Sequence, residues 1–473
     1  MQIAVSSLSE ANKNSRIDSS FFRPDYMKSY ETVTHGSYSI LSQIAHITDG
    51  NHSKIAENFD GSSDVRYLRG QDLGADMMLH DRNVVYIPEF RFNSLKRSHI
   101  HRNDILITIV GANTGLVGWV HDPPEKLVAN CKLGIIRSDR SEILPGYLYC
   151  FLTGRYGQDQ ILRSIRGGGQ TGLILPDIRQ LRIARLSKNF ESEMDGLVFD
   201  GHLKMAESKN VYYKGQTRLL SELGLTNWQI KHQLSFVKNY SDTQRARRVD
   251  ADYFQPKYEE IVNAIKSYPG GWGRLGDLVA VQKGVEVGSD EYLEEGVPSV
   301  RVSNLSPFEI SEDKYISEKL YGEIEQHQPK RGEILLSKDA TPGIAHYLDQ
   351  RPPKMIPSGG ILRLTNQTDK VNNEYLTLVL NSILTKEQVS RDVGGSVILH
   401  WRPDQVKGTV IPILPKEKQA QIQQKVTESF NFRKQSRHLL ECAKRAVEIA
   451  IEQDEQAALD WLEGEVRPVA AAP

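Results

Sequence analysis

The chain has 473 residues, of which 39% are hydrophobic and 25% charged, and its formal net charge is −1. This length exceeds one ordinary domain, and the composition is that of a globular protein with material for more than one core. The near-zero charge excludes a surface coated with lysine, but it allows local basic patches. Three scattered cysteines, Cys131, Cys150 and Cys442, lack CxxC spacing, so a disulfide framework or a zinc site is not expected.

The N-terminal stretch MQIAVSSLSEANKNSRID is polar and lacks the basic and then apolar build of a signal peptide. No apolar run approaches the ~20 residues that a membrane-spanning helix needs. We therefore expect a cytoplasmic protein without a membrane partner.

The phrase RIDSSFFRPDY at 16–26 recurs as RVDADYFQPKY at 248–258. Further pairs of similar phrases keep the same order along the chain: 5–18 with 237–250, 68–73 with 300–305, 101–108 with 330–337, 146–152 with 374–380, and 176–186 with 403–414. The ordered matches predict a duplicated protein whose surface loops differ slightly in length.

Each copy is expected to be a mixed α/β domain. In the first, apolar runs with flanking turn residues predict strands at 105–110 and 132–138, and 144–165 is predicted to form one helix. In the second, 333–338 and 359–365 are the corresponding predicted strands. Strands interspersed with helices predict the α+β class.

Each copy is followed by a stretch with apolar residues at near-helical spacing, 187–222 and 415–464. We expect two long helices that pair as an antiparallel coiled-coil spacer, so that two tandem domains and two helices form a pseudo-two-fold arrangement. Duplex DNA is a common partner for such symmetry. The expected boundaries are a first domain at 1–186, a helix and linker at 187–228, a second domain at 229–414, a second helix at 415–466, and a disordered tail at 467–473.

The sequence contains no complete catalytic motif. GANTG at 111–115 and GGGQTG at 167–172 lack the Lys-Ser/Thr of a phosphate-binding loop and favour turns. HDPPEK at 121–126 lacks the aromatic residue that would stack on a flipped base. We therefore predict no catalytic residue, no cofactor and no metal. The basic stretches RFNSLKRSHIHR at 91–102 and TQRARR at 243–248 favour binding to phosphates instead.

The ordered phrases and trailing helices resemble the specificity subunits of type I restriction-modification systems. The resemblance rests on the paired phrases at 16–26 and 248–258, on NDILITIVGANTG and GEILLSKDATPG, on GGGQTGLILPDIRQLRI, and on VIPILPKEKQAQI before the second helix. The Gly-x-Thr-Pro opening common in that family's first domain is replaced by DGNHSKIAEN at 49–58. This departure implies a divergent branch, with a related methylation-based phage-defence system as an alternative setting.

The family implies two target-recognition domains that each read half of a split DNA sequence. It also implies double-stranded DNA and two methyltransferase subunits as partners, with or without a nuclease-translocase. Polar loop residues would enter the major groove, where base pairs can be distinguished. The candidate DNA-binding residues are Arg69, Gln71, Arg97, Asn113, Arg166, Gln170, Thr171, Arg301, Ser303, Asn304, Lys338, Thr341, Ser396, His400 and Arg402.

Two alternatives stay open at this level. The chain could be a pseudo-dimeric scaffold that recruits proteins without reading bases, which equal affinity for all DNA sequences would favour. It could also be an enzyme with an atypical nuclease site, which cleavage or methyl transfer by the isolated chain would favour.

Overall fold

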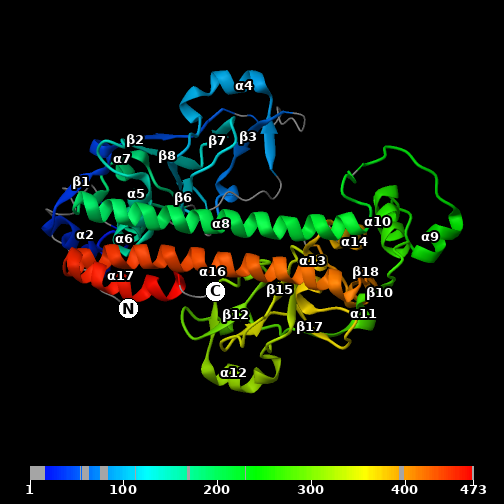
Figure 1. Ribbon diagram of the computed structural model, residues 1–473. Helices are drawn as coiled ribbons and strands as arrows, with labels where there is room; N and C mark the ends of the chain where they lie inside the picture. The colour runs from blue at the N-terminus through cyan, green and yellow to red at the C-terminus, as the bar shows by residue number, and fades with distance from the viewer. Residues whose placement is uncertain are drawn as a thin grey trace. The chain divides into compact units, whose positions relative to one another are not determined.

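The computed structural model describes residues 16, 18–53, 55, 63–74, 84–111, 113–167, 171–229, 231–393 and 399–470. The chain divides into two compact units, whose elements are labelled in Figure 1. Unit 1 consists of Met1–Met205 and Arg433–Pro473, and unit 2 consists of Ala206–Phe432. The two boundaries fall inside the two longest helices.

Unit 1 alternates short strands and helices before its long helix begins. Its elements are α2 (Pro24–His35), β1 (Tyr38–Ile40), α3 (Leu41–Ile44), β2 (Ala45–Asp49), β3 (Val65–Leu68), η2 (Gly70–Asp72), β4 (Val85–Ile87), α4 (Glu89–Ser94), η3 (Lys96–Ser98), β5 (Asp104–Thr108), β6 (Val117–Val120), β7 (Leu127–Ala129), β8 (Leu133–Ser138), α5 (Pro145–Thr153), α6 (Arg155–Ser164), α7 (Leu175–Arg179), β9 (Arg182–Ala184) and the start of α8 (Lys188–Glu222).

Two sheets and a layer of helices build unit 1. An antiparallel sheet has the order β2-β8-β5-β6, a second sheet has the order β4-β3-β7 with β3 and β7 parallel, and β1 pairs with β9. Both faces of strand β5 are covered, so the strand is buried along its whole length. Successive side chains point to opposite faces and therefore enter different cores. Ile105 and Ile107 pack into the core shared with helix α5, whereas Leu106 packs into the core shared with β3 and β7.

A buried ion pair joins β5 to β8. Arg137 donates to both oxygens of Asp104 at 2.8 and 2.7 Å, and only 1% of the Asp104 side chain is exposed. The backbone N–H of His101 donates to the same carboxylate at 2.7 Å. A buried charge is tolerated when it is paired and hydrogen-bonded in this way. The hydrogen bond that Arg137 donates to Asp104 raises the pKa of Arg137.

Unit 2 contains a similar series of elements. They are α9 (Tyr240–Ala246), α10 (Pro256–Lys266), β10 (Trp272–Arg274), α11 (Leu275–Leu278), β11 (Val279–Lys283), η4 (Ser289–Glu291), β12 (Val297–Val300), η5 (Val302–Asn304), β13 (Tyr315–Ile316), α12 (Glu318–Ile324), η6 (Glu325–His327), β14 (Ile334–Ser337), β15 (Ala345–Tyr347), β16 (Ile356–Pro357), β17 (Ile361–Asn366), α13 (Asn373–Asn381), α14 (Ile383–Asp392), α15 (Pro403–Gly408), β18 (Val410–Pro412) and the start of α16 (Lys416–Glu452).

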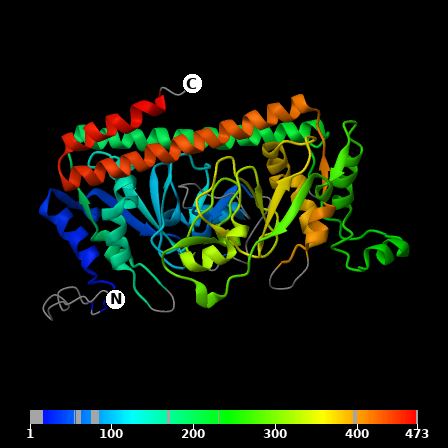
Figure 2. The ribbon, with the colours of Figure 1, turned by 90° about the horizontal axis from the view of Figure 1, so that it is seen from below.

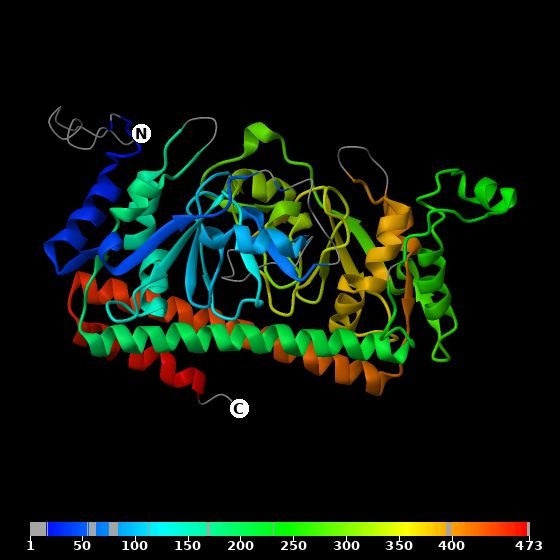
Figure 3. The same cartoon turned by 90° about the horizontal axis from the view of Figure 1, so that it is seen from above.

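The sheets of unit 2 have the orders β11-β17-β14-β15 and β13-β12-β16, with β12 and β16 parallel and β10 paired with β18. These are the strand orders of unit 1, element for element. Arg363 on β17 donates to both oxygens of Glu333 at 2.9 Å, and both side chains are almost fully buried. Glu333 occupies the place of Asp104, but its arginine lies two residues earlier on the neighbouring strand, since Thr365 holds the position of Arg137. Figure 3 shows α9 standing apart from these sheets, before α10.

The expected mixed α/β organisation and the two long helices are confirmed. The second helix, expected at 415–466, instead ends at Glu452 and a separate helix runs from Glu455 to Ala470, so the start of the expected disordered tail at 467–473 is helical. Within unit 2, Arg218 on α8 donates to Gln421 on α16 at 3.0 Å, and the hydroxyls of Ser208 and Ser429 lie 3.0 Å apart. Residue numbers rise along α8 as they fall along α16, so these two segments are antiparallel.

Within unit 1, Gly201 of α8 packs closely on α16, since a Cβ there would lie 3.0 Å from Leu440 Cγ and 3.2 Å from Ser436 O. Helix α17 (Glu455–Ala470) follows α16 after a break in which Asp454 accepts a hydrogen bond from Ala457 N at 2.8 Å. Figure 2 shows α17 lying back against the C-terminal part of α16.

The single helix predicted at 144–165 is wrong in one respect, because the segment forms two helices, α5 and α6. Gly154 between them is extended, with φ −76° and ψ 171°, and it is the N-cap residue of α6. A Cβ at Gly157 would lie 2.2 Å from Phe151 O, so the second helix packs tightly on the first. The apolar pattern did not indicate this break because both helices are apolar on the faces they bury.

Candidate nucleic-acid interface

In unit 1, two turns meet beyond one end of the sheets. The turn between β5 and β6 joins the segment after α6 through a bridge between Val110 and Gly172, and Leu173 N donates to Ile109 O at 2.8 Å. The Thr171 hydroxyl donates to Gly111 O at 3.1 Å. Gly111 has a φ of 114°, which favours glycine because other side chains are strained there. Thr171 therefore helps to fix the turn that carries Asn113.

Gln71 and Asn113 line one hollow of about 390 Å³, together with Thr114, Gly115 and Gln158. Both predicted residues are exposed. Side-chain amides offer a donor and an acceptor side by side, which is the pattern needed to pair with the edge of a base. The structure thus brings these two candidates, 42 residues apart in sequence, to one concave surface.

The predicted arginines of unit 1 are engaged in ion pairs. Arg69 donates to Asp72 at 3.0 and 2.8 Å, and its backbone N–H donates to the same carboxylate at 2.8 Å, which closes the turn η2 that presents Gln71. Arg166 donates to Asp177 at 2.8 and 2.9 Å, and this bond raises the pKa of Arg166. Both guanidinium groups hold turns in place.

Arg97 lies on η3, outside these turns, and contacts the end of β2. Its Nε donates to Thr48 Oγ1 at 3.0 Å, it pairs with Asp49, and 66% of its side chain is exposed. His52 lies 2.7 Å from the other oxygen of Asp49. Gln170 of unit 1 and Ser396 of unit 2 lie outside the described residues.

In unit 2, three predicted residues gather around one acid that the sequence analysis did not single out, Asp339. His400 Nδ1 lies 2.8 Å from Asp339, Lys338 pairs with the same carboxylate, and Thr341 N donates to Asp339 O at 2.6 Å. Burial opposes ionisation, but the hydrogen bonds from Lys338 and His400 outweigh it and hold the pKa of Asp339 below its ordinary value. The only sequence signal for Asp339 is its place in KDATPG, between the candidate DNA-binding residues Lys338 and Thr341.

The turn η5 repeats the construction of η2. Asn304 accepts from Arg301 N at 2.9 Å, as Asp72 does from Arg69, and Arg301 and Asn304 both bind Asp313. Asn304 is 5% exposed, whereas Ser303 is exposed, as Gln71 is in unit 1. Asn304 therefore supports the turn, and Ser303 is the residue of this pair that faces solvent.

Arg402 is exposed and lies 3.3 Å from Asp404, which stands where Asp177 stands in unit 1. Asp177 is bound by Arg166 from the preceding turn, and Asp404 by Arg402 from the N-cap position of α15. Arginine thus reaches the equivalent acid from different positions in the two units.

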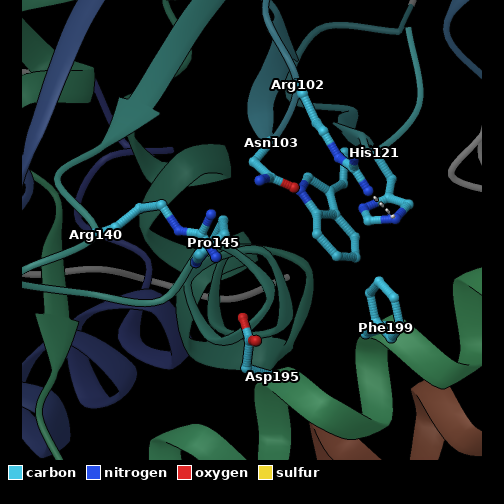
Figure 4. Close-up of a pocket in the computed structure, with 8 residues that line it drawn as sticks. Arg102, Asn103, His121, Arg140, Pro145, Asp195 and Phe199 are labelled. Atoms are coloured by element: carbon cyan, nitrogen blue, oxygen red, sulfur yellow. Dashed lines mark hydrogen bonds between the residues drawn. The ribbon is translucent and has the colours of Figure 1, made fainter.

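A second hollow of unit 1, of about 270 Å³, lies between the strands and α8 and contains none of the predicted residues (Figure 4). Arg102 and His121 line it from the strand side, and Asp195 and Phe199 line it from α8. Asp195 accepts a hydrogen bond from Gly146 N at 2.7 Å at the start of α5, so its carboxylate caps that helix. Burial raises the pKa of Asp195. This hollow therefore belongs to the packing of α8 against the strands of unit 1.

Among the described residues, no group of three or more His, Cys, Asp or Glu side chains is placed to hold a metal ion. No helix in the described part of the chain is long and apolar enough to cross a membrane.

The family model of the type I restriction modification DNA specificity domain matches residues 269–439, which run from β10 into α16. This match confirms, over residues 269–439, the resemblance inferred from the repeated phrases. No curated protein sequence matches the chain.

Two solved structures are similar to this chain at low identity. The S subunit of a type I restriction-modification system from M. genitalium is 13% identical, with a TM-score of 0.35, and the match covers 90% of this chain and 95% of that chain. The HsdS subunit from Thermoanaerobacter tengcongensis is 15% identical, with a TM-score of 0.27 and coverage of 90% and 96%.

Proposed function

We propose that this chain is a non-catalytic subunit that gives a DNA methyltransferase or restriction-modification complex its sequence specificity. The observation that carries the proposal is the match of residues 269–439 to a DNA specificity domain. Catalysis would come from companion subunits, namely two methyltransferase subunits and, in some assemblies, a nuclease-translocase.

In this proposal the chain holds two versions of one target-recognition domain, at 1–186 and 229–414, followed by spacer segments at 187–228 and 415–466 and a tail at 467–473. The identical strand orders of the two units support a common origin. Each domain would read one half of a bipartite DNA target. The halves would differ, because the exposed residues of the two domains differ where their supporting residues agree.

Base contacts are assigned to exposed polar side chains on the turns. In the first domain they are Gln71 and Asn113, whose amides can pair with adenine N6 and N7. In the second they are Ser303, Thr341 and His400. The ion-paired residues Arg69, Arg166 and Arg301 would position these turns. Their guanidinium groups would also contact DNA phosphates.

Helices α8 and α16 would form the spacer between the two recognition domains. The antiparallel contacts within unit 2, and the close approach of Gly201 to α16 within unit 1, support a continuous coiled-coil pairing. Helix α8 has 35 residues, which corresponds to about 52 Å at 1.5 Å per residue. That length suits a gap of about one to one and a half turns of DNA, at ~34 Å per turn.

Sequencing of methylated bases in cells with and without the gene tests this function. A split motif that loses its methylation on deletion is the expected result. Unchanged methylation, together with equal affinity of the purified complex for all DNA sequences at several salt concentrations, would contradict it and favour a scaffold.

A further inference from the structure

The two units carry opposite charge on equivalent helices. Residues 89–98, which form α4 and η3, hold three cations and one acid, for a formal charge of +2. Residues 318–327, which form α12 and η6, hold one cation and three acids, for a formal charge of −2. Figure 1 shows α4 beyond the three-stranded sheet of unit 1, on the side away from α8.

Two ion pairs establish that these helices are equivalent. Lys126 pairs with Glu89 at the start of α4. In the same way Lys354 pairs with Glu318 at the start of α12, with 2.9 Å between Lys354 Nζ and Glu318 Oε2. Helix α4 follows β4 and helix α12 follows β13, and each of these strands is antiparallel to the centre of its three-stranded sheet. Lys96 and Arg97 therefore correspond to Glu325 and Gln326.

The basic surface of unit 1 adjoins the turns that carry the candidate base contacts. Arg97 is anchored on Thr48 and Asp49 at the end of β2, and the chain continues through Gly50, whose N–H donates to Leu133 O at 3.0 Å. Ile109 N, at the start of the turn that holds Asn113, donates to Lys132 O at 2.8 Å. The sugar-phosphate backbone of a DNA bound at those turns would therefore pass beside η3.

The cations are accessible. The Lys96 side chain is exposed and makes no hydrogen bond or ion pair with the residues that the structure describes. Arg97 shares Asp49 with His52 but keeps 66% of its side chain exposed.

The corresponding surface of unit 2 is acidic. Strand register places Asp49 opposite Gly134 and Lys283 opposite Leu362, so Glu286 corresponds to His52. Glu286 and Glu325 are both exposed. Two exposed acids would repel a phosphate chain at this place.

Given the proposed function, we infer that unit 1 holds the DNA backbone beside its half of the target through Lys96 and Arg97, and that unit 2 has no such contact. Cations on phosphate add affinity without sequence information, because they release condensed counterions. Unit 1 thus supplies more of the salt-dependent affinity, and unit 2 relies more on its base contacts.

The test exchanges the residues between the units in the full chain, assembled with its methyltransferase partners. The affinity for the specific duplex and for an unrelated duplex is measured across salt concentration. In the variant Lys96→Glu with Arg97→Gln, the slope of log affinity against log salt should become shallower by about 2, at about 0.9 per lost phosphate contact. Between about 50 and 200 mM salt the affinity would then fall about 12-fold less, equally for both duplexes.

Two further variants keep the test decisive. Lys96→Ala removes a cation whose side chain pairs with none of the described residues, so it should reduce the slope by about 1 without affecting folding. The reciprocal change, Glu325→Lys with Gln326→Arg, should make the slope steeper. An unchanged slope in Lys96→Ala, or a change confined to the specific duplex, would overturn the inference. Equal affinity of the unaltered complex for both duplexes would instead overturn the proposed function.

Discussion

Arg16 and Asp18, which open the repeated phrase, form an ion pair at 2.6 Å, and the carboxylate accepts the N–H of Phe21 at 3.0 Å. Arg248 and Asp250 form the same pair at 2.6 Å. The bond from Arg16 holds the pKa of Asp18 below its ordinary value. The phrase recurs because it builds the turn that leads into α2 and α10. Sequence comparison predicted the recurrence, but the role depended on local hydrogen bonds that spacing does not indicate.

Gln71 and Ser303 occupy equivalent exposed positions, so they form a matched pair for testing base contacts. Gln71→Ala should relax the sequence preference in one half of the target, with a loss of discrimination of about 1–3 kcal/mol at one base pair. Ser303→Ala should affect only the other half. Affinities for single-base variants of the target measure this. A uniform loss for all sequences in Gln71→Ala would assign that residue to the backbone instead.

His121 predicts a pH dependence of unit 1. It is 9% exposed and packs on Trp119, Phe199 and His202 at ring distances of 4.9 to 5.1 Å. Burial, and then the charge of Arg102, lowers the pKa of His121, although the charges of Asp122 and Asp195 oppose this shift. Because the folded pKa lies below the unfolded value of about 6.5, its contribution to stability is complete above that pH and is lost as pH falls.

The melting temperature should therefore fall less between about pH 7.5 and pH 5 in His121→Phe than in the unaltered protein. His46, an exposed histidine on β2, provides the control, since His46→Gln should keep the full dependence. An identical loss at low pH in His121→Phe would assign the effect to other groups.

At the scale of elements, the sequence predicted the central strands well, since 105–110 contains most of β5 and 132–138 contains β8. It did not predict that the acid before each strand is buried. Asp104 and Glu333 follow turn residues and so resemble surface positions, yet each meets an arginine from the neighbouring strand. Such pairing depends on strand order, which local patterns do not contain. The break at Gly154 was missed for another reason, because both α5 and α6 are apolar on the faces that they bury.

The spacer proposal makes a prediction about α8 and α16. Seven helical residues inserted in each, at the unit boundaries after Met205 and after Phe432, keep the side-chain face and add about 10.5 Å. The gap in the methylated motif should lengthen by about three base pairs, and both half-sequences should stay the same. Motif analysis of cells that carry the variant measures both. A changed half-sequence would contradict a spacer role.

At the scale of the whole molecule, the net charge of −1 conceals a contrast between +2 and −2 on equivalent helices. The sequence indicated a basic stretch at 91–102. It did not indicate the acidic counterpart, because α4 and α12 share little sequence and are matched only through their strands and ion pairs. The same holds for the candidate site: the polar loop residues chosen from the sequence included Gln71 and Asn113 but not Asp339, which organises the second cluster.

The central claim is that one chain carries two separate recognition domains for two halves of one DNA target. Replacing residues 248–412 by the corresponding segment of a relative, followed by sequencing of methylated bases, tests it most directly. The account predicts that one half of the motif changes while the other half and the gap length persist. A change in both halves, or in neither, would contradict it.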